Sequence, residues 1–162
     1  MKDKATSLDI EIAVSHLIGY RVNTIVPNVS WGLGLNHECD LLVLDKLNRF
    51  TEIEIKVSIS DLKADFNKYH GHSSKIISRM YYAFPYEMLD RALPLIPKHI
   101  GIITCKKTDI FYMGKSGYKA EYYRQARHDK YSRPTEKQVI KFLELGCMRI
   151  WSLKIHLFSK LQ

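Results

Sequence analysis

The sequence predicts an α/β domain in which helices flank a mixed β-sheet. Two observations support this fold class. Residues 37–44 and 49–57 have the apolar content and alternation of β-strands, and the strand-like segments 79–84 and 99–105 are each preceded by a segment with helical spacing. Strands that alternate with helices are typical of layered domains with crossover connections. The 162 residues, of which 46% are hydrophobic, are enough for one domain with its own core.

The N-terminal part is predicted to be a helix followed by an antiparallel hairpin. Residues 7–20 carry an apolar stripe, with Ser7 as a candidate cap and Gly19 near the end. A Pro27-containing link and a glycine-rich segment then lead to the strand-like HECDLLVL. The DKLN segment supplies a turn, so the following strand returns beside the first.

The middle of the chain continues with alternating helices and strands. Ser58 and Asp61 form an S-x-x-D capping pattern, which predicts a helix that runs to about Tyr69. The elements expected after it are a strand at 79–84, a short helix at 86–93, a strand at 99–105 and a further short strand at 110–113.

The C-terminal part is predicted to be helical. Thr135 and Gln138 form a capping box, and apolar residues recur beyond them at helical spacing. We therefore expect a domain over residues 1–133 and a helical extension over 134–162 that packs on the same domain. Self-association through the apolar stripe of this extension is the alternative.

Composition and charge narrow the class of protein. The chain carries 25 Lys and Arg against 17 Asp and Glu, and the excess lies beyond residue 61: residues 1–61 have a net charge of −3 and residues 62–162 one of +11. A basic excess favours a polyanionic partner such as DNA, although it can also serve solubility. The lack of a long apolar run or secretory signal predicts a cytoplasmic protein without membrane contact. The three cysteines are far apart and are expected to pack rather than bind zinc.

One strand face carries charged residues that need explanation. Glu52, Glu54 and Lys56 alternate with apolar residues and therefore point to the same side of their strand, where Glu52 is expected to remain in solvent. The ordinary interpretation is a solvated sheet face. Asp40 on the preceding strand argues for another, because a carboxylate in so apolar a strand needs a partner or a cation. If the hairpin closes around residues 45–49, Asp40 and Glu54 lie close enough to share a Mg²⁺ ion, with Lys56 beside it.

These residues resemble a known family. Asp40 followed by Glu54-Ile55-Lys56 is similar to the signature of the PD-(D/E)xK nuclease superfamily, which implies a restriction-endonuclease-like core. The segment EIKVSISDLKADF, the strand that ends at Pro85 and LPLIPKHIGIITC resemble the MmcB-like group of DNA repair proteins. The resemblance implies a DNA nuclease that uses Mg²⁺, with Mn²⁺ as a substitute. It implies that Asp40, Glu54 and Glu11 hold the metal and that Lys56 assists the attacking water.

Other polar residues are assigned secondary roles. Near the site, Glu38 is expected to face the same way as Asp40, and the resemblance suggests that Ser58, Asp61 and Asp65 support Lys56 or the rim. Residues 117–134 interleave aromatic and basic side chains, which suits contact with phosphates and bases, although an amphipathic helix with a charged face explains the pattern equally well. The candidate DNA-binding residues in this segment are Lys119, Tyr123, Arg124, Arg127, Lys130 and Arg133.

Three functions remain open at this level. The first is a magnesium-dependent deoxyribonuclease that acts in DNA repair. The second is a module that has kept the nuclease fold to bind DNA or a repair partner without hydrolysis. The third is a basic α/β interaction protein whose charged strand face is solvated. Self-association and a repair-protein partner are compatible with the first two.

Overall fold

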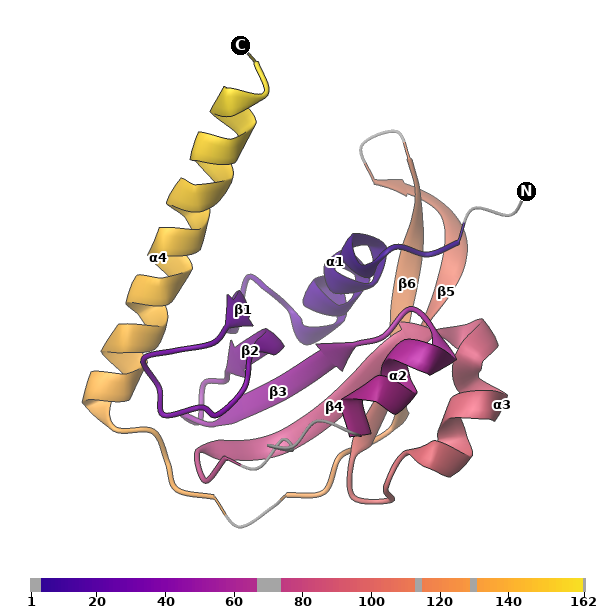
Figure 1. Cartoon of the computed structure of the whole chain (residues 1–162), viewed down its shortest axis with the longest axis horizontal. Helices are drawn as coiled ribbons and strands as arrows, with labels where there is room; N and C mark the ends of the chain where they lie inside the picture. The colour runs from indigo at the N-terminus through magenta and orange to yellow at the C-terminus, as the bar shows by residue number, and fades with distance from the viewer. Residues whose placement is uncertain (1–3, 67–73, 113–114, 129–130, 162) are drawn as a thin grey trace.

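The computed structural model describes residues 4–66, 74–112, 115–128 and 131–161 and shows a six-stranded mixed sheet flanked by helices (Figure 1). The predicted fold class is confirmed. The strands are β1 (Thr24–Val29), β2 (Cys39–Leu44), β3 (Phe50–Ile55), β4 (Ile77–Pro85), β5 (Gly101–Tyr112) and β6 (Lys115–Arg124). The helices are α1 (Ser7–Ile18), α2 (Ile59–Phe66), α3 (Leu89–Ala92) between two short 3₁₀ turns, and α4 (Glu136–Ser159). The predicted end of α2 near Tyr69 lies outside the described residues.

The strands lie in the sheet in the same order as in the chain. β1, β2 and β3 pair antiparallel, β3, β4 and β5 pair parallel, and β5 and β6 form a long antiparallel hairpin. Parallel neighbours need a crossover, which α2 supplies between β3 and β4 and α3 supplies between β4 and β5. The predicted hairpin and both predicted crossovers are therefore present.

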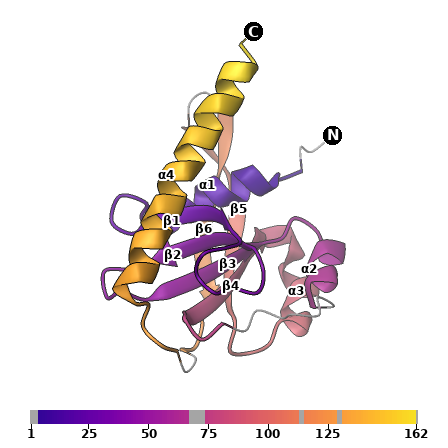
Figure 2. The same cartoon turned by 60° about the vertical axis from the view of Figure 1, so that its left-hand side comes forward.

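The two faces of the sheet are covered differently. One face packs against α1 through a core that includes Ile10, Val14, Ile53 and Ile103. On the other face, α4 covers the end near β1 and β2, whereas α2 and α3 cover β4 and β5 (Figures 1 and 2). The strand register places Glu52 and Glu54 on this second face, between the two apolar clusters.

Some local predictions were wrong. α1 is capped by Thr6, whose side chain accepts a hydrogen bond from the backbone N–H of Asp9, and not by Ser7. The Pro27-containing link is strand β1, at the edge of the sheet where a proline is tolerated. The segment after residue 115 is a strand that continues into a loop, so the alternative of an amphipathic helix is wrong.

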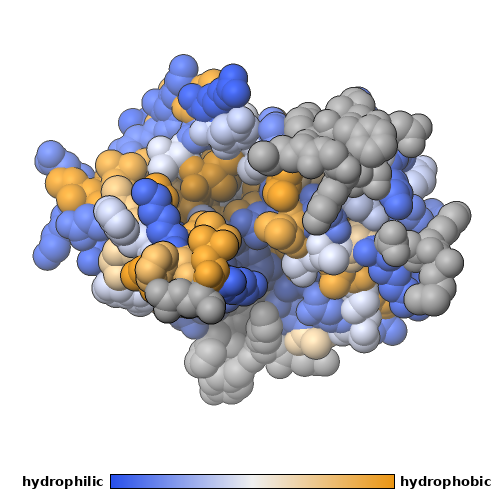
Figure 3. Space-filling view, turned by 90° about the horizontal axis from the view of Figure 1, so that it is seen from above, coloured by the Kyte–Doolittle hydropathy of each residue, from blue (hydrophilic) through white to orange (hydrophobic). Residues whose placement is uncertain are grey.

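Helix α4 packs on the sheet through its first half only. Phe142 and Leu145 are buried there, and Phe142 meets Phe50 edge-on with ring centroids 5.0 Å apart. The second half projects from the domain and exposes apolar side chains such as Trp151 and Ile155, and Figure 3 shows apolar residues gathered near its end. Within the described residues, no helix combines the length and apolar character needed to cross a membrane.

Candidate active site in an acidic cleft

The site lies where β2 and β3 stop pairing through their backbones. The ladder between these strands reaches Leu41 and Ile53. Beyond this pair, the Asp40 carboxylate accepts a hydrogen bond of 2.7 Å from the backbone N–H of Ile55. The backbone N–H of Asp40 in turn donates to the Glu54 carboxylate over 3.4 Å. The two acidic side chains are therefore fixed at the point where the strands separate.

Lys56 is held by two carboxylates. Its ammonium group donates to Glu54 over 2.9 Å and to Asp65 of α2 over 3.1 Å. Asp65 also accepts a hydrogen bond of 2.8 Å from the Tyr82 hydroxyl of β4. All four side chains are buried, and Glu54 is only 1% exposed. Because Asp65 lies in the second turn of crossover helix α2, the change from strand to helix after Lys56 brings a carboxylate back to the lysine.

Glu11 reaches the same place from the first helix. A cleft of about 340 Å³ is lined by residues of α1, β1, β2, β3 and α2 and of the adjoining loops. The structure therefore brings together all four residues predicted to carry the chemistry. The cleft is lined by Ser7, Glu11, Asn28, Glu38, Asp40, Glu54, Ile55, Lys56 and Asp61.

The charges in this cleft perturb one another. Burial and the charge of Asp40 raise the pKa of Glu54 to about 7, against the opposing effect of Lys56. Burial and the same aspartate also raise the pKa of Glu11. Burial alone would lower the pKa of Lys56, but the charges and hydrogen bonds of Glu54 and Asp65 outweigh it and raise the pKa. Lys56 is therefore a cation at neutral pH, whereas the carboxylates have an excess of negative charge.

The donor set suits a hard divalent cation. Carboxylate oxygens from Glu11, Asp40 and Glu54 face one cleft, and magnesium binds through one or two carboxylates while it keeps several waters. A divalent cation among these groups would offset the negative charge that now raises the pKa values of Glu11 and Glu54. The residues present therefore fit Mg²⁺ or Mn²⁺.

The predicted secondary residues divide into two groups. Asp65 holds Lys56 directly, and Asp61 and Glu38 line the cleft with exposed side chains. Ser58 does not line it; its hydroxyl accepts a hydrogen bond from the backbone N–H of Asp61 and so begins α2. The S-x-x-D pattern therefore marks a helix start, as predicted from the sequence.

Buried Glu52 and half-buried His37 form a pair that was not predicted from the sequence. Glu52 was predicted to face solvent, but it is 0% exposed, and its carboxylate lies 2.7 Å from Nε2 of His37. The Cys39 thiol lies 3.6 Å from the same nitrogen, and the ligand atoms of these three residues lie within 4.8 Å of one another. Burial and the neighbouring carboxylates raise the pKa of Cys39 well above its ordinary value, so the thiol keeps its proton. The pair fixes the loop before β2 on β3.

The predicted DNA-binding residues do not form one surface of free side chains. Arg124 donates from its guanidinium group to the backbone carbonyls of Ile96, Pro97 and Ile100 and so has a structural role. Lys119 forms an exposed ion pair of 3.0 Å with Glu121. Tyr123, Arg127 and Arg133 are exposed, and Lys130 lies outside the described residues.

The comparisons with known proteins agree with this architecture. A family model described as "DNA repair protein MmcB-like" matches residues 1–156. The solved structure of the SPO1766 protein of unknown function from Silicibacter pomeroyi is similar, with a TM-score of 0.66, 18% sequence identity, and coverage of 94% of this chain and 93% of that chain. At this identity the likeness supports the fold alone. No curated protein matches the chain.

Proposed function

Because this chain belongs to the MmcB-like family of DNA repair proteins, we propose that it is a metal-dependent deoxyribonuclease that hydrolyses phosphodiester bonds in its acidic cleft. One observation carries the proposal: Glu11 of α1, Asp40 of β2, Glu54 of β3 and Lys56 directly after β3 line the same cleft. A solvated strand face, the ordinary alternative, is inconsistent with the burial of Glu54 and Lys56.

Each side chain has a role that follows from its contacts. Asp40 and Glu54, together with Glu11, would hold Mg²⁺ or Mn²⁺, and the backbone hydrogen bonds of Asp40 and Ile55 fix the first two carboxylates in place. When bound, the ion supplies a Lewis acid for a phosphoryl oxygen and lowers the pKa of a bound water.

Lys56 is suited to stabilise negative charge and not to remove a proton. Its pKa is raised, so it stays protonated at neutral pH. An ammonium group has three N–H donors, and among the described residues Glu54 and Asp65 accept from two of them. The third is suited to orient the attacking water or to donate to a phosphoryl oxygen as its charge grows.

The test is cleavage of labelled DNA by the purified full chain with Mg²⁺, Mn²⁺ or EDTA. We expect single-stranded, duplex or flapped DNA to be cut with either metal and not with EDTA. Lys56→Ala should lower the rate about 100-fold or more. The matched control is Lys63→Ala, which removes an exposed lysine of α2 outside the cleft. Cleavage by Lys56→Ala at the wild-type rate contradicts the assigned role.

A metal titration separates hydrolysis from binding alone. We expect Mn²⁺ to bind the wild-type chain and to bind Asp40→Asn far more weakly, because the variant loses a carboxylate ligand. If neither protein binds Mn²⁺, a DNA-binding module without hydrolysis explains the family membership better.

A further inference from the structure

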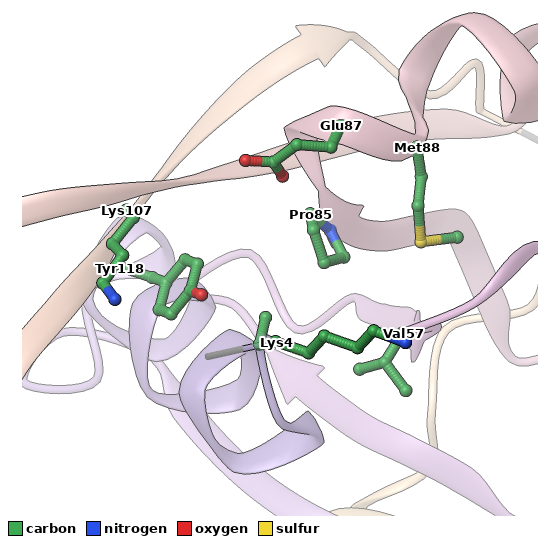
Figure 4. Close-up of a pocket in the computed structure, with 8 residues that line it drawn as sticks. Lys4, Val57, Pro85, Glu87, Met88, Lys107 and Tyr118 are labelled. Carbon is green, nitrogen blue, oxygen red and sulfur yellow. The ribbon is translucent and has the colours of Figure 1, made fainter. Parts of the chain in front are cut away.

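A second pocket, with a volume of about 550 Å³, adjoins the acidic cleft. Figure 4 shows its arrangement: Tyr118 and Lys107 come from the β5–β6 hairpin, Lys4 and Val57 lie below them, and Pro85 and Met88 lie opposite. The volume is within the range of about 300–1,000 Å³ that is typical of pockets for small molecules.

The pocket and the cleft share two stretches of backbone. Val57 lines the pocket and directly follows Lys56, which lines the cleft. Ala5 lines the pocket two residues before Ser7, which lines the cleft. Because consecutive Cα atoms are about 3.8 Å apart, the stretch of backbone that carries Lys56 into the cleft also borders the pocket.

The lining has two kinds of chemistry. Val57, Pro85 and Met88 give apolar walls, and Tyr118 adds an aromatic ring. Lys4 and Lys107 add two exposed cations at the edge, whereas the acidic cleft beside them carries negative charge. A pocket with apolar and aromatic walls and ammonium groups at its edge is complementary to a flat base attached to a phosphate. Glu87, also in the lining, is an acceptor for an N–H group on the base edge.

We propose that this pocket binds one unpaired nucleotide of the DNA strand whose backbone lies in the acidic cleft. The inference rests on the proposed nuclease function, which it extends to a class of substrate. A base in an intact duplex is paired and stacked, so it enters such a pocket only after it leaves the stack. The preferred DNA therefore has a single-stranded, mismatched or frayed nucleotide next to the phosphate in the cleft.

The test measures binding apart from cleavage. Short fluorescein-labelled single strands, in each of which one nucleotide lacks its base, are titrated with the full chain in Ca²⁺, a hard cation that accepts the same oxygen ligands. Fluorescence anisotropy gives the Kd at each position. We expect the loss of one particular base to weaken binding about tenfold, and the loss of the others to have little effect.

Two variants connect this position to the pocket. Tyr118→Leu keeps an apolar side chain against the core but removes the ring, so the tenfold effect should disappear. Lys107→Ala should weaken binding to every labelled DNA strand equally. It should also reduce the slope of log Kd against log salt concentration by about one unit, as expected for the loss of one phosphate contact. The matched control is Lys106→Ala on the same strand, because Lys106 lies over the ring of Tyr86 and does not line the pocket.

The outcomes separate the two proposals. A Kd that is the same at every abasic position, or a position effect that Tyr118→Leu leaves intact while its melting temperature matches wild type, overturns the pocket assignment even if the chain cuts DNA. A position effect that Tyr118→Leu abolishes supports the pocket even if no cleavage is found, in which case only the nuclease function fails.

Discussion

Replacing Glu54 with glutamine should make the metal-free protein more stable at alkaline pH. Burial and the charge of Asp40 raise the pKa of Glu54 from an ordinary value of 4.5 to about 7. A carboxyl group with a raised pKa in the folded state binds its proton more tightly there than in the unfolded chain. Its stabilising effect is therefore fully present below 4.5 and is lost as the pH rises through about 7. Glutamine is neutral at every pH and avoids this loss.

The size of the effect follows from the two pKa values. At 1.36 kcal/mol for each pH unit, the interval from 4.5 to about 7 corresponds to roughly 3 kcal/mol. Glu54 is 1% exposed, so solvent screens this effect little, but the variant also loses the charge that attracts Lys56. We therefore expect Glu54→Gln to gain about 1–3 kcal/mol near pH 8, or about 3–10 °C in Tm for a chain of this size.

The assay is urea and thermal unfolding in EDTA at about pH 5 and about pH 8, followed by circular dichroism. Glu121→Gln is the matched control, because Glu121 is an exposed carboxylate of β6 paired with Lys119. The free energy of unfolding of this variant should differ from wild type by less than about 0.5 kcal/mol. Mn²⁺ should stabilise the wild type more than Glu54→Gln. A variant less stable than wild type at pH 8, or an equal gain at both pH values, would refute the reasoning.

Three further predictions concern residues that support the site or the core. Asp65→Asn should lower DNA cleavage about 10–100-fold while Mn²⁺ affinity stays near wild type, since Asp65 positions Lys56 and lies outside the carboxylate set; equal losses in both would contradict this. His37→Ala should lower the free energy of unfolding by about 2–3 kcal/mol in urea, because it leaves the fully buried Glu52 carboxylate without its histidine partner; an unchanged urea midpoint would argue against the pair. Phe142→Ala should cost about 3–5 kcal/mol by the same measurement, and a cost below about 1 kcal/mol would mean that α4 adds little to the core.

The central part of the fold could be predicted because its signals are local. Alternating apolar residues identify β2 and β3, and the turn between them sets the register. Once Leu41 faces Ile53, Asp40 and Glu54 must lie beside each other, so a cross-strand pair follows from positions 14 residues apart. After Lys56 the apolar residues change from the alternation of a strand to the spacing of a helix, which likewise predicts a crossover helix. The register does not predict the hydrogen bond between Asp65 and Lys56, because this contact depends on how α2 packs.

The unpredicted features depend on contacts between distant segments. β1 contains a proline and a left-handed Asn28 with φ 52°, so its local pattern resembles a loop, and pairing with β2 makes it a strand. Glu52 gives no local sign of burial, because its partner His37 lies in a loop 15 residues earlier. Arg124 is of a residue type that often contacts DNA, yet it donates a hydrogen bond to the backbone carbonyl of Ile100, just before β5. Sequence type indicates what such residues can do, and only packing decides what they contact.

The row Glu52, Glu54 and Lys56 shows why a site is the better explanation of this strand. If these residues served solubility alone, they would face water, but none is more than 4% exposed and Asp65 is buried with them. Four ionisable groups between two apolar clusters cost stability, and hydrophobic residues of similar volume would often be neutral or stabilising there. His37, Tyr82 and the backbone N–H groups of Asp40 and Ile55 offset part of this cost, but Glu54 and Glu11 keep raised pKa values. Carboxylates whose negative charge is offset only in part, as at Glu54 and Glu11, are poorly suited to hold a fold together and well suited to hold a cation.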